Sequence, residues 1–128
     1  MDNGIVTRTS VYCVSETLDR LEAALQQHQI KVFARIDQQA EAQNADLALR
    51  PTQLLVFGSP QAGTPLMNAF PALALDLPLK ALAWEAEDGQ VRLLTNSSEY
   101  LQARHGLPSP PFGPMEALFD AAVSASPL

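Results

Sequence analysis

The sequence predicts an α+β fold, a two-layer sandwich in which helices pack on a mainly antiparallel sheet of about five strands. Segments rich in β-branched residues alternate with segments whose apolar residues recur at helical spacing. An Asp-Gly pair at 88–89 separates two alternating runs, a pattern typical of an antiparallel hairpin. Hydrophobic residues form 47% of the 128 residues, which is enough for one compact core.

The chain begins with a predicted strand and a predicted helix. The run 5–14 is rich in β-branched residues and is expected to form the first strand. Ser15 is a suitable N-cap for the next segment, in which apolar residues follow the spacing of one helical face. These features predict a helix over 16–29.

A second strand is predicted over 30–37, and a short alanine-rich helix over 38–45. Successive side chains of a strand point to opposite faces, so simple alternation divides this strand into two sets. These are Val32, Ala34 and Ile36 on one face and Phe33, Arg35 and Asp37 on the other.

The run 53–58 is apolar on both faces, which predicts a central strand that needs cover from helices or from a second subunit. It leads into "GSPQAGT", which has the glycine spacing of a phosphate-binding loop but Thr64 in place of the required lysine. Thr64 as N-cap and Pro65 as first helical residue predict a strand-to-helix turn and a short helix that ends before Pro71. The N-terminus of that helix is a candidate site for a small anion or carboxylate.

A two-residue type I′ turn at Asp88-Gly89 sets the register of the predicted hairpin. In this register Trp84 faces the core, and an ion pair forms on the opposite face. The cross-strand pairs are Glu87 with Gln90, Glu85 with Arg92, and Trp84 with Leu93.

Two helices are predicted after the hairpin. Ser97 or Ser98 caps the first, which ends at Gly106. A stiff proline-rich connector follows, and Pro114 suits the first turn of the last helix. One face of that helix is expected to carry Met115, Leu118, Phe119 and Ala122.

Composition excludes several classes of partner. Eight basic and fourteen acidic residues give a net charge of −6, which repels phosphate backbones and disfavours nucleic acid. The N-terminus has no signal-peptide pattern, and no run approaches the roughly 20 apolar residues that span a bilayer. With a single cysteine, and so no internal disulfide, these features predict a cytoplasmic protein with no membrane partner.

Few residues favour catalysis or metal binding. Cys13 is predicted to be a buried, inert strand residue, although the nearby helix N-terminus offers a way to activate its thiol. His28 and His105 each lie at the end of a predicted helix, where a histidine interacts well with the helix dipole. No Cys or His partner lies at metal-ligand spacing, so no metal and no cofactor are predicted.

Several polar residues are candidates to line a ligand-binding cleft between the sheet and the helices. Arginine in a partly apolar setting suits carboxylate or phosphate groups. An alternative for Arg35 and Asp37 is that they pair with neighbours across the sheet. The candidate ligand-binding residues are Arg35, Asp37, Arg50, Gly63, Thr64, Asn96 and Tyr100.

Several phrases together resemble the DUF302 family, a domain of unknown function. They are "KVFARID", "LRPTQLLVFGSPQAGTPLM", "DLPLKALAWEAEDGQVRL" and "EYLQARHGL", in this order, and the resemblance covers about residues 11–107. It implies a curved sheet of the TATA-binding-protein-like type and a domain often found as a dimer. Many members have a histidine where this chain has Gln38, which weakens an enzymatic interpretation. The predicted organisation is one domain over 1–107, with the connector and last helix of 108–128 packed on it.

Three functional hypotheses follow. The first is a non-catalytic domain that binds a small anionic or amphipathic ligand as a homodimer. The second is a dimeric interaction or structural module. The third, which the residues favour least, is an enzyme that uses Cys13 or a histidine.

Overall fold

Five strands form one antiparallel sheet in the order β1-β5-β4-β3-β2 in the computed structural model, which describes residues 3–125. This confirms the predicted α+β class. The strands are β1 (Ile5–Ser10), β2 (Lys31–Asp37), β3 (Thr52–Gly58), β4 (Leu79–Glu85) and β5 (Val91–Asn96).

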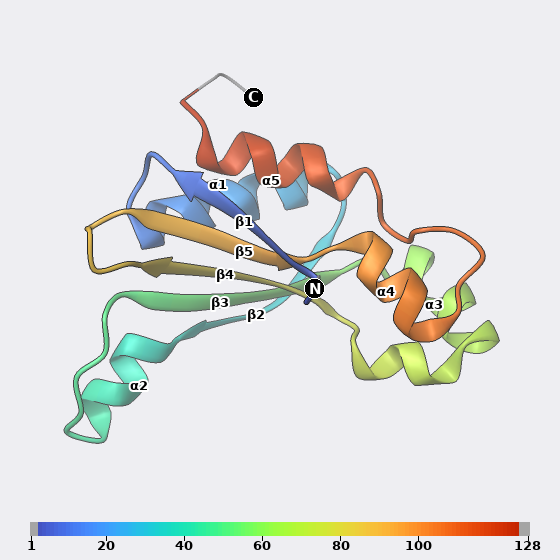
Figure 1. Cartoon of the computed structure of the whole chain (residues 1–128), viewed down its shortest axis with the longest axis horizontal. Helices are drawn as coiled ribbons and strands as arrows, with labels where there is room; N and C mark the ends of the chain where they lie inside the picture. Colours follow the sequence, from blue (N-terminus) through green and yellow to red (C-terminus); the bar gives the residue numbers. More distant parts are fainter. Residues whose placement is uncertain (1–2, 126–128) are drawn as a thin grey trace.

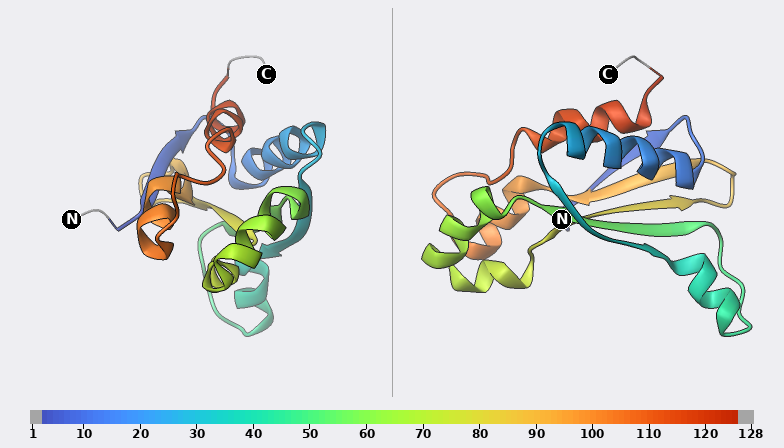
Figure 2. Two further views of the ribbon diagram at one scale, coloured as in Figure 1. Left: turned by 90° about the vertical axis from the view of Figure 1, so that its right-hand side faces the viewer. Right: turned by 180° about the vertical axis from the view of Figure 1, so that it is seen from behind.

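The helices are distributed unevenly about the sheet. Two helices, α1 and α5, lie side by side over one face, while α3 and α4 gather at one end of the sheet and α2 lies at the other end (Figures 1 and 2). The α-helices are α1 (Val14–Gln27), α2 (Gln38–Asn44), α3 (Pro60–Ala69), α4 (Ser98–His105) and α5 (Met115–Val123), and a 3₁₀ helix, η1, spans Pro71–Leu75.

The core lies between the sheet and the pair α1 and α5. Leu18, Leu21 and Leu25 of α1 are fully buried, as the helical spacing of these residues requires. Phe57 of β3 meets Phe119 of α5 edge to face, with ring centroids 6.0 Å apart. Burial of each such side chain contributes about 1.5–3 kcal/mol to stability, so α5 is an integral part of the core.

The first strand is shorter than predicted. It ends at Ser10, whose Oγ lies 2.6 Å from Thr17 Oγ1 and accepts a hydrogen bond from the Tyr12 amide. This polar turn stops the strand before Cys13, which instead caps α1: its Sγ accepts a hydrogen bond from the Glu16 amide at 3.4 Å. The predicted buried strand position of Cys13 is therefore wrong, and so is Ser15 as the N-cap.

A β-bulge in β2 changes the predicted faces of this strand. Val32 pairs with Phe57 and Ala34 pairs with Val56, so Phe33 is the extra residue between them. Because one inserted residue shifts the alternation, Arg35 lies on the same face as Val32, toward α1, and not on the opposite face.

The helix after β3 begins earlier than predicted. Ser59 is its N-cap, since its Oγ accepts a hydrogen bond from the Ala62 amide, and Pro60 is its first residue. Ser59 and Pro60 therefore take the N-cap and first-residue positions that the sequence predicts for Thr64 and Pro65. Pro65 lies inside α3, where it removes one helical hydrogen bond.

The hairpin register differs from the predicted one by one residue. Gly89 donates from its amide to Ala86 O, and only Gly89 of the turn has a positive φ, so the loop is a longer turn with a bulge and not a type I′ turn. Trp84 consequently faces away from α1, and Ala83 takes its place in the core. The observed pairs are Ala83 with Leu93, Trp84 with Arg92, and Glu85 with Val91.

The caps predicted for α4 are confirmed, whereas Pro114 lies at the N-cap position of α5, immediately before its first residue Met115. Ser97 Oγ accepts a hydrogen bond from the Tyr100 amide at the start of α4. Gly106 ends α4 with a φ of 66°, a left-handed conformation that costs glycine nothing. The buried face of α5 contains the four predicted residues, Met115, Leu118, Phe119 and Ala122.

An apolar row crosses the face of the sheet opposite α1 and α5. Ile36 pairs with Leu54, Leu54 with Leu82, and Leu82 with Leu94, so one side chain from each of four neighbouring strands lies in line. Ile36 is 38% exposed and the three leucines are half-buried. We call these four residues the apolar row.

Candidate functional site

A cavity of about 390 Å³ lies where β3 ends and α3 begins. This volume is within the range of small-molecule sites. Four separate stretches of the chain form its wall: the start of β2, the β3–α3 junction, the approach to β4 and the connector before α5. The lining residues are Ile30, Phe33, Phe57, Gly58, Ser59, Pro60, Ala62, Gly63, Thr64, Met67, Leu77, Pro78, Leu79, Phe112, Pro114 and Met115.

The residues at the β3–α3 junction explain how the cavity forms. The Ser59 cap starts α3 immediately after β3, so the helix leaves the end of the sheet at once. Gly58 and Gly63 line the cavity at this point, and because they lack side chains they leave space in it. A methyl group at Gly58 would lie 3.5 Å from Phe33 Cε2, and one at Gly63 would lie 3.6 Å from Leu77 Cδ1. Both distances are ordinary contacts, so larger side chains at these positions would occupy the cavity.

The lining is almost entirely carbon. Its side chains include no charged group, and only Ser59 and Thr64 carry a hydroxyl. Burying an isolated charge against such a surface is costly, whereas burying apolar surface is favourable. The cavity therefore suits a ligand whose enclosed part is hydrocarbon.

The helix N-terminus at the cavity offers few donors to an anion. Pro60 has no amide hydrogen, and the amides of Ala62 and Gly63 already donate to Ser59. The helix dipole alone is a weak attraction for a small anion.

The structure brings only two of the predicted ligand-binding residues, Gly63 and Thr64, to this cavity. Asp37 caps α2 by accepting from the Ala40 amide, and Arg50 pairs with Glu87 at 3.3 Å. Asn96 lies beside the apolar row, in a shallow hollow of about 170 Å³.

Tyr100, the remaining candidate in α4, packs against Gly4. The seven residues therefore do not line one cleft, and a ligand contact for the five outside the cavity stays a prediction.

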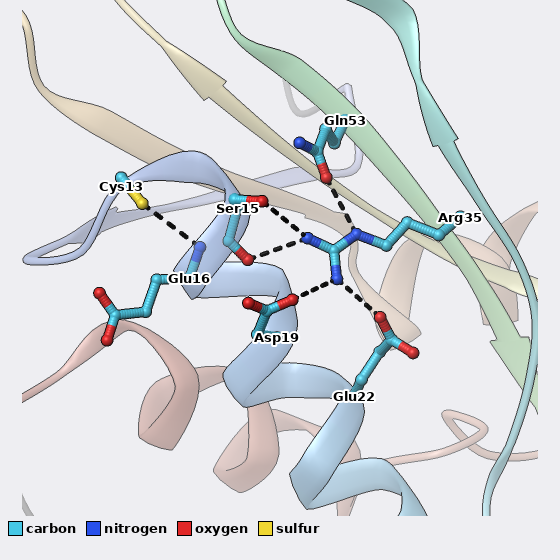
Figure 3. A network of polar contacts seen from close by, with 7 residues as sticks. All are labelled: Cys13, Ser15, Glu16, Asp19, Glu22, Arg35 and Gln53. Carbon is cyan, nitrogen blue, oxygen red and sulfur yellow. Dashed lines mark hydrogen bonds and ion pairs between the residues drawn. The ribbon is translucent and has the colours of Figure 1, made fainter.

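Arg35 lies at the centre of a polar network between β2 and α1 (Figure 3). Its Nη1 donates to Asp19 Oδ1 at 2.6 Å and to Glu22 Oε2 at 2.7 Å. Its Nε donates to Gln53 Oε1 at 2.9 Å, and its Nη2 to Ser15 O at 2.9 Å. These bonds satisfy most of the guanidinium donors.

The network also stabilises the positive charge of Arg35. Burial, the largest single effect, lowers the pKa of the guanidinium, but the hydrogen bonds to Asp19 and Glu22 and the negative charges of these two residues together raise it by more, so the net shift is upward. Arg35 thus anchors α1 to the sheet, which agrees with the alternative of pairing with neighbours. Asp19 and Glu22 belong to a helix, however, and not to an adjacent strand.

The residues considered for catalysis are dispersed. Cys13 is exposed, and its Sγ contacts the Glu16 amide. His28 Nδ1 lies 2.9 Å from Ala24 O in its own helix, and His105 Nε2 lies 2.6 Å from Asp76 Oδ2, linking α4 to the end of η1. Among residues 3–125, no three His, Cys, Asp or Glu side chains converge as a metal site would require.

Sequence reasoning missed most of the cavity wall. The sequence predicts Phe33 in a regular strand, Phe112 in a stiff connector and Pro114 in the first turn of the last helix, and none of these assignments predicts a cavity wall. The available signal was the group of aromatic and proline residues in that connector, "PSPPFGPM", which is unusually apolar for an exposed linker.

An antiparallel sheet with helices on one face and an apolar cavity at one end defines this chain as an α+β sandwich domain. More specifically, it belongs to the DUF302 family, whose description is "Domain of unknown function DUF302" and which matches residues 6–123. The match continues through α5, whereas the phrases that resemble the family cover only about residues 11–107.

A solved structure shows the same fold. It is the crystal structure of an uncharacterized conserved protein DUF302 from Bacillus stearothermophilus, with a TM-score of 0.79 over 95% of this chain and 97% of that chain. Sequence identity to it is 19%, so the likeness concerns the fold alone.

Two curated relatives are 44% identical to this chain over 107 residues, which is 84% of its length. They are the fluoride-specific ion channels FluC 1 of Brucella suis biovar 1 and FluC 2 of Brucella melitensis biotype 1. The match covers 42% and 40% of these proteins, so the chain spans about two fifths of their length. Within residues 3–125 of this chain, no helix has the length and apolar character needed to cross a bilayer.

Proposed function

We propose that this chain is a non-catalytic domain that binds a small amphipathic ligand in the cavity at the end of β3, and that it acts as a homodimer. The observation that carries the proposal is the carbon lining of the 390 Å³ cavity. An apolar cavity of this size favours hydrocarbon, and the dispersed Cys and His residues favour no reaction.

The energetics favour the amphipathic ligand over the anionic one. Each methylene group moved from water into the cavity contributes about 0.8 kcal/mol. A wholly polar anion would gain no such term, and Ser59 already occupies the amides at the start of α3.

The homodimer proposal rests on the apolar row. It lies on the face that α1 and α5 leave uncovered, and antiparallel sheets with one apolar uncovered face gain stability when that face is buried. A second copy is the occupant we propose, because a row of Ile and Leu side chains is complementary to itself across a two-fold axis. An exposed Cys13 thiol suits a reducing compartment such as the cytoplasm.

A series of straight-chain alcohols, monitored through backbone amide NMR shifts, tests the cavity. From hexanol to decanol, affinity should rise by about fourfold for each methylene until the chain fills the cavity. The amides of Gly63 and Met67 should shift with it, because both residues line the wall.

A matched pair of variants completes this test. Gly63→Leu fills the cavity and should weaken decanol binding at least tenfold, whereas Ala69→Leu, on an exposed position of the same helix, should leave it unchanged. Equal affinities in both variants would place the alcohol elsewhere and contradict the proposal.

A second candidate function is an accessory role beside a fluoride-specific ion channel. The relatives so named are 44% identical to this chain, which covers only about two fifths of them. A channel must cross the membrane, and no helix of residues 3–125 does so. We infer that the matched region of those relatives is a separate domain that works with their membrane-spanning part. Fluoride efflux from liposomes that contain such a channel should change when this protein is added, and unchanged efflux would remove this candidate.

A further inference from the structure

Lys31 is next to two residues of the cavity wall and is a candidate partner for the head group of a ligand. In the β2–β3 pair, Lys31 lies opposite Gly58, a residue of the cavity wall. Its Nζ lies 5.1 Å from the ring centroid of Phe33, a second residue of the wall. Lys31 is exposed and is not a lining residue, so its ammonium group lies outside the carbon lining, next to the Phe33 ring.

Lys31 also differs from the arginines in its partners. Arg8, Arg35, Arg50, Arg92 and Arg104 each form an ion pair with a carboxylate, and Arg20 donates to backbone carbonyls at the end of α5. Within the part of the chain that the structure describes, Lys31 and Lys80 have no carboxylate within ion-pair distance. An ammonium group has three donors, and contact with the Phe33 ring does not use them.

We propose that the cavity binds an amphipathic carboxylate, with its hydrocarbon chain inside and its carboxylate paired with Lys31 Nζ at the opening. This inference rests on the proposed ligand-binding function and names the class of ligand. One lysine is a single point charge and suits a monoanion, and a protein with a net charge of −6 repels a polyanionic head group.

The bulge in β2 explains why Lys31 lies next to the cavity wall. Without the extra residue, Phe33 would follow the regular alternation of the strand. The bulge lets Phe33 reach toward Gly58, and the Lys31 side chain then rests on the ring. Phe33 thereby links the cavity wall to the ammonium group of Lys31.

The test compares decanoate, below its micelle concentration, with decanol, below its solubility limit, by calorimetric titration at low salt. Lys31→Met keeps the aliphatic stem and removes the charge. It should weaken decanoate binding about threefold, the size expected of an exposed charge pair, and leave decanol binding unchanged. Raising the salt concentration should weaken decanoate binding to the unsubstituted protein by a similar factor and have little effect on the variant.

Lys80→Met is the matched control, because Lys80 is an exposed lysine in β4 that lies outside the cavity wall, in the shallow hollow beside the apolar row. It should not alter decanoate binding. If Lys31→Met leaves decanoate affinity unchanged, or if Lys80→Met lowers it instead, the carboxylate assignment is wrong while decanol binding still supports the cavity. If neither probe binds the unsubstituted protein, the ligand-binding function itself is contradicted.

Discussion

Arg35 Nη1 on β2 lies 2.6 Å from Asp19 Oδ1 on α1 and so ties the sheet directly to the helix that covers it (Figure 3). The same nitrogen reaches Glu22, and Arg35 is 23% exposed. The arginine therefore has a structural role that does not depend on any ligand.

Replacing Arg35 should lower the free energy of unfolding. Arg35→Met keeps the stem and removes the donors, and it should destabilise the protein by about 1–2 kcal/mol, since hydrogen bonds to charged groups contribute at this level. Arg50→Met is the control, because the pair of Arg50 with Glu87 is more exposed and should contribute less than about 0.5 kcal/mol. Urea unfolding of both variants measures the difference, and equal midpoints would argue against an anchoring role for Arg35.

Substitution of Gly89 should lower the stability of the protein because of the backbone conformation at this residue and not because of a steric clash. Its φ is 82°, and nothing lies within 4 Å of a methyl group placed there. Gly89→Ala should therefore cost about 1 kcal/mol through strain. Gly113 has equally open surroundings without a positive φ, so Gly113→Ala should be neutral or slightly stabilising. Thermal unfolding of the two variants checks the turn, and a type I′ turn would instead require positive φ at two residues.

The Cys13 thiol should react in the folded protein. It is exposed and caps α1, so a thiol reagent should label it without denaturant. Cys13→Ala should lower stability by about 1 kcal/mol through loss of the cap, and Cys13→Ser should retain or improve it. Labelling that requires unfolding would show that the thiol is buried.

The apolar row should control the oligomeric state. We expect the unsubstituted protein to sediment as a dimer and Leu82→Glu, at the centre of the row, to sediment as a folded monomer. Leu75→Glu changes a leucine that is 74% exposed on η1 and should leave the dimer intact. Circular dichroism of each variant checks that it is folded. A monomeric unsubstituted protein would contradict the homodimer proposal directly.

The sequence by itself determined the order of the elements and several of their ends. Ser97 and Gly106 bound α4 as predicted, and the apolar face of α5 is the predicted one. Caps and amphipathic periodicity act within one or two turns of the chain, so they can be identified without knowledge of the rest of the fold.

Only the tertiary structure decided the register and the site. The bulge at Phe33 and the longer turn at Gly89 each shift a strand by one residue, and this shift turned Arg35 toward α1 and Trp84 away from it. The cavity depends on the same long-range packing, because its wall joins β2 to a connector some 80 residues away. Such contacts are decided by which side chains fit together in the folded core, and that is not encoded in any short stretch of the sequence.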